Sequence, residues 1–435
     1  MKTVIRSLSF LLLLLALFGC SQTGVSSSND TGNPPEVTDN GDDNGGDDNG
    51  GNAGNPGNGG TPGDSDTPVG ETITLVSIPD QATGSLDALR VAVSPSYGLF
   101  KTSYAPYDYI FSRDNINGVC WDLYNQEFCI NYLYPSLDRC GAFVIPVRDR
   151  EYGKIGVSGQ ETWKENALLY LQSIGAAAAS VPSIADTTVR SWHAINMDAD
   201  CFLAVSISTT GTPTGTTARG TLVYVWNSTD GITNPPTDTL PAGTGPLMQS
   251  ASSNIFKAAS AIDSTWKNRG VAGMDFGTLR VLKDDHLAGN SHVPGVHVAL
   301  GFADNALDVE QLKTPAMKVA MARALTVSLI DSMTAKTGLY PPARPGIVSA
   351  TKHDGLIELT WLAGTDPFTS ASTAPKAYVI KVFSNTGAYL GSLQVSADTL
   401  TAKVPAASGS TVTIKVSARN EYGESADSDA VSVTM

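Results

Sequence analysis

The sequence predicts an α/β domain followed by a smaller all-β sandwich. In the first part, Val296, Val298 and Leu300 lie among other apolar residues, as in a strand that is buried on both faces of a sheet. From Ile347 to Met435, short alternating apolar runs are separated by turn residues, which is typical of a sandwich of about ninety residues. Between the two parts, the Pro-rich stretch from Tyr340 to Pro345 predicts a hinge.

The first twenty residues predict a secretory signal peptide. Two basic residues precede an apolar run from Phe10 to Phe18, and this run is too short for an ordinary membrane span. The ending Leu17-Phe18-Gly19-Cys20 resembles a bacterial lipoprotein box, which implies that Cys20 is lipidated and anchors the chain to a membrane. A plain signal peptide with an incidental Cys is the alternative. Because Ser21 follows the Cys, the signal resembles one for the outer membrane of a Gram-negative envelope.

Residues 21–71 predict a disordered, acidic linker. They consist mainly of Gly, Asn, Asp, Pro and Ser, and such a composition buries too little apolar surface to offset the entropy of ordering. The linker also holds much of the net charge of -14. Nothing in the chain is basic enough to predict a nucleic-acid partner.

Four cysteines remain once Cys20 is assigned to lipidation: Cys120, Cys129, Cys140 and Cys201. An even number in an exported chain favours two disulfides, although the sequence leaves the pairing open. Cys120–Cys129 or Cys129–Cys140 would form a local staple. Cys201 lies in an apolar strand, so a buried free thiol is its alternative.

Strands and helices follow one another along the α/β domain. Apolar runs predict strands at Leu89 to Val93 and Phe202 to Ser206. Helical spacing predicts helices at Gln160 to Ile174 and Ser250 to Trp266. The face of the second helix holds Ile255, Ala258, Ala259 and Ile262. We also expect a helix end at Trp266 to Val271 and a short β segment at Leu279 to Lys283.

An aromatic-rich segment interrupts this order at about residues 100–155. Its aromatic residues are Tyr104, Tyr107, Tyr109, Phe111, Trp121, Tyr124, Phe128, Tyr132 and Tyr134. Because aromatic rings stack on sugar faces, a glycan-binding insertion is one interpretation. The favoured interpretation is a small disulfide-stapled subdomain that uses these rings as its core.

Several motifs of the α/β part resemble zinc-dependent N-acetylmuramoyl-L-alanine amidases, which cut the glycan–peptide amide of peptidoglycan. The resemblance is strongest in Asn268-Arg269-Gly270-Val271, in Leu279-Arg280-Val281-Leu282, and in the strand from Pro294 that runs through Gly301-Phe302 to Asn305. Arg190 and the segment from Ala199 to Ser206 also resemble the family. Gly220 to Trp226 matches its following strand, and Asp308 to Leu312 and Thr314 to Met333 look like its closing helices. The resemblance covers about residues 84–335 and implies an amidase-like domain, a sheet flanked by helices, at residues 72–340.

The resemblance also implies where zinc ligands would stand. Tyr97 and Ser206 take the positions of two His ligands, and Ala299 takes that of a Glu. Glu161 is a possible remnant of a further ligand Glu, with Glu151 as an alternative, although a helix dipole favours a first-turn Glu in any case. Since catalytic zinc needs about three protein ligands, we expect no metal and no cofactor.

A relocated metal site is the alternative. His297 shares a strand face with Ala299, and His193, His286 and His292 are nearby in the sequence. Histidines in loops, or satisfied histidines in the core, are the preferred interpretation. Zinc is expected only if these residues form a new site.

The part after the hinge resembles a fibronectin type III domain, at residues 341–435. Trp361 would be its core tryptophan, and Ala418 to Ser425 its last hairpin. Val412 stands where the family has its corner Tyr, which is a departure from the pattern. A module of this kind spaces or binds.

Together these features predict a lipid-anchored protein of the cell envelope that binds peptidoglycan or a related glycan without cleaving it. One alternative is an active amidase with a relocated metal site. Another is a surface interaction or adhesion protein, in which the amidase-like groove has no remaining role.

Overall fold

The computed structural model describes residues 73–95, 115–116, 119–147, 190–191, 194–195, 197–208, 210, 216–228, 236, 238–283 and 293–435. The predicted signal peptide and linker lie outside these residues, and so does the predicted helix at Gln160 to Ile174. The fold class is as predicted, an α/β sheet flanked by helices and an all-β sandwich. In this described part, no helix is both long enough and apolar enough to span a membrane.

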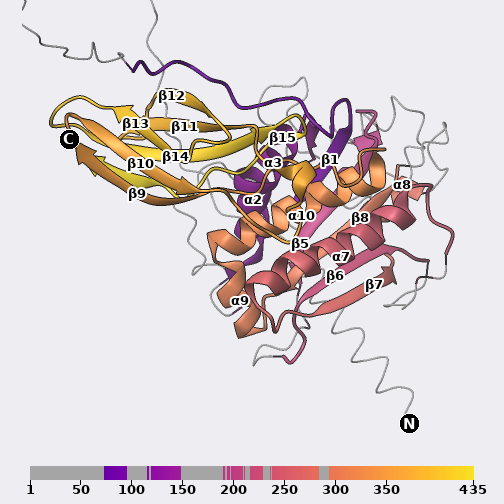
Figure 1. Cartoon of the computed structure of the whole chain (residues 1–435). Coiled ribbons are helices and arrows are strands. Elements are labelled where there is room, and N and C mark those ends of the chain that lie inside the picture. The colour runs from indigo at the N-terminus through magenta and orange to yellow at the C-terminus, as the bar shows by residue number, and fades with distance from the viewer. Residues whose placement is uncertain are drawn as a thin grey trace, which may run out of the picture. The chain divides into compact units, whose positions relative to one another are not determined.

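The strands of the α/β domain are β1 (Arg90–Pro95), β4 (Phe143–Pro146), β5 (Cys201–Ser208), β6 (Thr221–Trp226), β7 (Asn268–Met274) and β8 (Gly295–Phe302). They form one sheet in the order β4-β1-β5-β8-β6-β7 (Figure 1). The first four strands in this order are parallel, β6 is antiparallel to β8, and β7 is parallel to β6. All residues of β6 and β8 are buried, because side chains on both faces of the sheet are covered.

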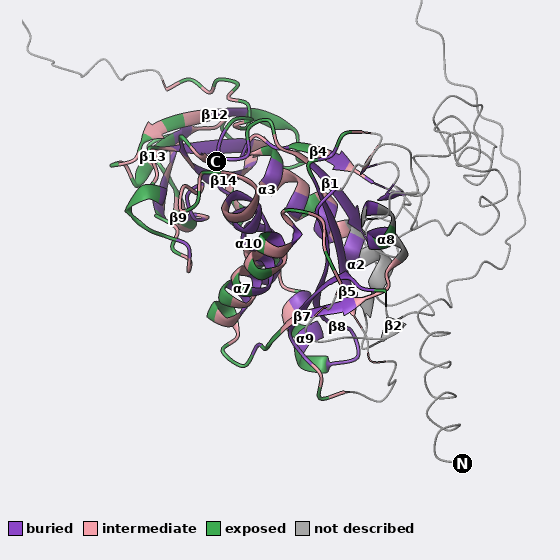
Figure 2. Ribbon diagram, turned by 90° about the vertical axis from the view of Figure 1, so that its right-hand side faces the viewer, coloured by how far each residue is buried: buried purple, intermediate pink, exposed green. Residues whose placement is uncertain are grey.

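Helices cover both faces of this sheet (Figure 2). One face packs against α7 (Thr244–Ile262) and α10 (Pro315–Met333), which contact each other along their length and enclose the main apolar core. The opposite face packs against α8 (Gly277–Lys283), whose Leu279 and Leu282 join Phe202 of β5. The remaining described elements are α2 (Trp121–Phe128), the π-helix η1 (Cys129–Leu133), α3 (Tyr134–Asp138), α9 (Ala306–Leu312), and the short paired strands β2 (Asn115–Ile116) and β3 (Val119–Cys120).

Three local predictions are wrong. The residues predicted as a helix end lie mostly in β7, at the edge of the sheet, where they pair with β6. The predicted β segment at Leu279 to Lys283 is part of α8, because Leu279 and Leu282, three residues apart, lie on one side of a helix. The helix predicted at Ser250 to Trp266 is α7, which begins at Thr244 and ends at Ile262.

The sandwich consists of β9 (Gly346–His353), β10 (Leu356–Leu362), β11 (Ala377–Ser384), β12 (Tyr389–Ser396), β13 (Thr401–Pro405), β14 (Thr411–Asn420), β15 (Gly423–Glu424) and β16 (Val431–Thr434), with a 3-10 turn η3 (Ala371–Thr373). One sheet has the order β13-β10-β9 and the other β12-β11-β14-β15, with β16 also paired to β14. Trp361 is fully buried, and its ring centroid lies 5.5 Å from that of Tyr378. This tryptophan is therefore a core residue, as predicted.

The stretch predicted as a hinge is instead a packed contact between the two domains. Pro341, Pro342 and Ala343 are buried, and Arg323 of α10 donates hydrogen bonds to the carbonyl oxygens of Pro341 and Pro342, each at 3.0 Å. Phe368, in the loop after β10, is a member of the main core of the α/β domain. Proline predicts a break in regular structure, but burial depends on side chains that are distant in the sequence.

Candidate functional site

The carboxyl ends of the parallel strands β1, β5 and β8 lie at one edge of the sheet, where ligands of open α/β sheets bind. Two of the predicted positions meet there, because Ser206 of β5 and Ala299 of β8 are partners in the register. Both side chains are buried. Tyr97, the third substituted position, and Glu161, the possible remnant ligand, lie outside the described residues.

His297 occupies the space beside Ser206. The Nε2 atom of His297 and the Oγ atom of Ser206 are 2.8 Å apart and share a hydrogen bond. The His297 ring stacks on Phe276, with centroids 4.4 Å apart, and meets the edge of Tyr224 at 5.9 Å. Burial lowers the pKa of His297 to about 3. The imidazole is therefore neutral, and its environment is that of a packed core histidine.

The described residues at this edge do not fit a catalytic zinc ion. Ala299 has no donor atom, and the Ser206 hydroxyl is already hydrogen-bonded to His297. The surrounding cluster of Leu222, Tyr224, Ala272 and Ala299 is otherwise apolar, with Met274 and Phe276 packed against it. Among the residues that the structure describes, no group of three or more His, Cys, Asp or Glu side chains is placed to hold a metal ion. His193, His286 and His292 lie outside that part of the chain.

Arg190 holds the end of β1, which lies two residues before Tyr97 in the sequence. Its Nη1 atom donates to the carbonyl oxygen of Pro95 at 2.7 Å and to Ser94 Oγ at 3.2 Å. The Arg190 side chain is buried, so these bonds fix the last residues of the strand. Arg190, singled out by the resemblance, thus has a positioning role at the carboxyl edge.

Two aspartates at the same edge are not identified by the sequence reasoning. Asp304 Oδ2 accepts hydrogen bonds from the backbone N and the Oγ1 of Thr210, both at 2.6 Å. Asp308, in α9, accepts from Arg219 Nε at 3.0 Å and from the backbone N of Gly220 at 2.7 Å. Both carboxylates therefore bind the segments that follow β5 and precede β6. The available signal was Asn305, three residues before Asp308, which caps α9 as an Asn before a helix is expected to do.

The described part of the aromatic-rich segment forms a core. Tyr124 and Phe128 are fully buried, and their rings stack in parallel with centroids 6.4 Å apart. Tyr132 continues the stack, with its ring centroid 6.5 Å from that of Phe128. The rings are core residues, as the favoured interpretation expects, but they belong to the main core of the α/β domain and not to the core of a separate subdomain. Tyr104, Tyr107, Tyr109 and Phe111 lie outside the described residues.

The cysteines differ from the prediction of two disulfides. Cys140 and Cys201 are buried free thiols, so the Cys129–Cys140 pairing is not formed. Burial raises the pKa of the Cys140 thiol to about 12 and that of Cys201 further. Cys201 therefore follows its alternative, the buried thiol in an apolar strand. The Cys120–Cys129 pairing stays a prediction, because the side chain of Cys120 is outside the described residues.

No family model matches the chain, and no curated protein matches it. Among solved structures, the chain is similar to the N-acetylmuramoyl-L-alanine amidase from Clostridium difficile 630, with 14% identity over 57% of this chain and 99% of that chain, and a TM-score of 0.35. It is also similar to the apo form of the N-acetylmuramyl-L-alanine amidase Ami1 from Mycobacterium abscessus, with 13% identity over 57% of this chain and 100% of that chain, and a TM-score of 0.36. A third similarity, to the twitchin kinase region from C. elegans, has 14% identity over 22% of this chain and 17% of that chain, and a TM-score of 0.20.

Proposed function

We propose that this chain is a lipoprotein of the cell envelope, anchored through Cys20 to the outer membrane, whose amidase-like domain binds peptidoglycan or a related glycan without cleaving it. The observation that carries the proposal is the pairing of Ser206 with Ala299 at the carboxyl edge of the sheet. Hydrolysis by a zinc amidase needs a metal-bound water. Neither of these side chains is a zinc ligand of the usual kinds.

The hydrogen bond between Ser206 and His297 supports the same conclusion. Burial keeps the His297 ring neutral, and the ring is packed between aromatic neighbours. For His297 to bind a metal ion in place of a missing ligand, the core around the ring would have to open. The sheet edge itself is retained, with Arg190 and Asp304 fixing the segments around it. Because the carboxyl edge of the sheet is ordered but lacks the ligands for hydrolysis, it favours binding of a glycan over its cleavage.

The first test measures zinc and wall binding on the chain that begins at Ser21. Elemental analysis after dialysis with zinc is expected to find no bound zinc, and co-sedimentation with purified sacculi is expected to retain the protein. Incubation with sacculi is expected to release no new amino groups. A stoichiometry of about one zinc per chain would overturn the proposal in favour of an active amidase with Glu161, His193 and His297 as candidate ligands.

A pair of charge reversals tests whether the carboxyl edge is the binding surface. Arg269 is exposed, and its guanidinium lies 5.3 Å from the ring centroid of Phe302, at the end of β8. Lys352 is exposed on β9 of the sandwich. We expect Arg269→Glu to weaken sacculus binding, because wall peptides carry carboxylates, and Lys352→Glu to leave it unchanged. A zinc-free protein that does not bind sacculi would instead favour the surface interaction or adhesion role.

A further inference from the structure

Residues 74–84, here called the strap, lead from the sandwich to the α/β domain (Figure 1). At the start of the strap, Val76 N donates to the carbonyl oxygen of Ser392 in β12 at 3.0 Å, and Ser392 N donates to that of Val76 at 2.7 Å. Leu75 packs against the sandwich core. Gly391 permits this approach, because a Cβ atom on it would lie 2.7 Å from the Leu75 Cβ. The strap therefore adds to the edge of the sandwich.

The middle of the strap is bound by the hairpin of β14 and β15. Gln81 N donates to Glu424 Oε2 at 2.8 Å, and the Gln81 side chain donates to the carbonyl oxygen of Asn420 at 3.0 Å. Arg419 Nη2 donates to the carbonyl oxygen of Pro79 at 2.5 Å. These bonds fix both the backbone and the side chains of the strap on the sandwich.

The end of the strap lies between the two domains. A Cβ atom on Gly84 would be 2.3 Å from the Tyr422 carbonyl oxygen of the sandwich and 2.9 Å from that of Cys140 in the α/β domain. Lys336 Nζ donates to the Gly84 carbonyl oxygen at 2.9 Å. The next residue, Ser85, donates its backbone N to Tyr422 O at 3.0 Å. The strap thus reaches both domains.

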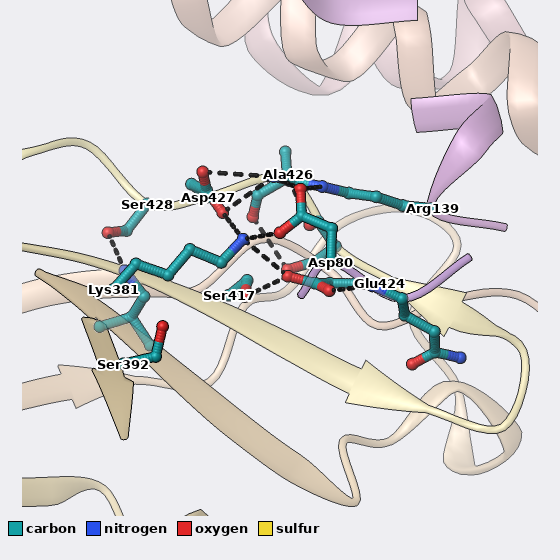
Figure 3. Close-up of polar contacts among 12 residues, drawn as sticks. Asp80, Arg139, Lys381, Ser392, Ser417, Glu424, Ala426, Asp427 and Ser428 are labelled. Atoms are coloured by element: carbon teal, nitrogen blue, oxygen red, sulfur yellow. Dashed lines mark hydrogen bonds and ion pairs between the residues drawn. The ribbon is translucent and has the colours of Figure 1, made fainter. Parts of the chain in front are cut away.

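Asp80 makes the charged contact at the centre of the strap (Figure 3). Its Oδ2 atom is 2.8 Å from Nη2 of Arg139, the residue after α3 in the α/β domain. Its Oδ1 atom is 2.5 Å from Nζ of Lys381, in β11 of the sandwich. Asp80 therefore bridges one cation from each domain. The same cluster contains Glu424, Asp427 and Arg419.

The charges of this cluster support one another. Burial would raise the pKa of Asp80, but Arg139 and Lys381 lower it below its ordinary value. Burial would also raise the pKa of Asp427, but the same two cations lower it below its ordinary value. Both cations are largely buried, with 11% of the Arg139 side chain and 6% of the Lys381 side chain exposed, so water screens them little.

We propose that the strap is a latch that fixes the sandwich against the α/β domain, with Asp80 as its ionic contact to both. The strap directly follows the predicted linker. A load applied through that linker is then received by the two domains together. The sandwich is accordingly a fixed part of one unit and not a spacer on a hinge.

Amide hydrogen exchange on the full chain in detergent micelles tests this latch. Asp80→Asn removes the charge that joins Arg139 to Lys381, while both cations keep other carboxylates. We expect exchange at the Val76 and Ser392 amides to become about tenfold faster, a charged hydrogen-bond effect reduced by the partial exposure of Asp80. Asp80→Glu, which keeps the carboxylate, is expected to preserve most of the protection.

The matched control is Asp398→Asn, which removes the same charge at an exposed position between β12 and β13. We expect this control to exchange like the unaltered chain. The proposal is overturned if Asp80→Asn leaves exchange at Val76 and Ser392 unchanged. It is also overturned if Asp80→Asn accelerates exchange equally in β5 and β8, because the residue would then contribute only to global stability.

Discussion

Replacement of His297 by Leu should make the stability of the protein less dependent on pH between 7 and 5. In the folded protein, burial lowers the pKa of His297 from its ordinary value of 6.5 to about 3. Between these two values the unfolded chain binds a proton that the folded chain does not. Lowering the pH in this window therefore favours the unfolded state.

The size of the effect follows from the separation of the two pKa values. At pH 5, protonation of the unfolded state reduces the free energy of unfolding by about 2 kcal/mol, and at pH 7 by only a few tenths of a kcal/mol. His297→Leu removes this contribution. The hydrogen bond to Ser206 is lost at both pH values, so that loss cancels in the comparison.

Urea unfolding followed by circular dichroism, at pH 7 and at pH 5, measures the difference. We expect the unaltered chain to lose about 2 kcal/mol more between these pH values than His297→Leu loses. His353→Leu is the matched control, because the His353 side chain is 57% exposed in the sandwich and its removal opens no core. Equal losses in the unaltered chain and in His297→Leu would refute the assignment of His297 as a buried neutral ring.

Two further predictions concern the same core and the contact between the domains. Ser206→Ala should lower the free energy of unfolding by about 1–3 kcal/mol, because it removes the hydrogen-bonding partner of the buried His297 Nε2. In urea unfolding, the double variant Ser206→Ala with His297→Leu should lose less free energy of unfolding than the sum of the losses of the two single variants. Simple additivity would contradict the hydrogen bond between Ser206 and His297. Phe368→Ala should cost about 3–5 kcal/mol in the same assay, because Phe368 belongs to the α/β core and lies under Lys257, whose Nζ is 5.0 Å from its ring centroid. Phe368→Leu, which keeps most of the apolar volume, should lower the free energy of unfolding clearly less. A loss below about 1 kcal/mol for Phe368→Ala would favour a hinge between the domains.

Much of the fold could be predicted from local patterns. The continuous apolar run of β8 and the alternation in β10 each carry their own signal, because side-chain period and secondary structure are directly linked. The expectation that Ala299 stands where the amidases have a ligand Glu likewise rests on the sequence alone. It needs only the motif around Gly301 and Phe302 to be recognised.

The identity of α8 and β7 could not be predicted in this way. The apolar residues of α8 are few, and the same short run is compatible with a strand or with a helix until its partner is known. The segment is a helix because Leu279 and Leu282 pack together on Phe202, a residue that is far from them in the sequence. The edge strand β7 is decided by its backbone pairing with β6.

By itself, the sequence determined which side chains are available: a Ser and an Ala where two ligands are expected, one nearby His, and a Pro-rich junction. Tertiary structure alone decided what they do. It places Ser206 against His297, buries the junction under Arg323, and joins Asp80 to Lys381. The physical reason is that burial and ion pairing depend on atoms that meet in space, and these partners are separated by as many as 301 residues.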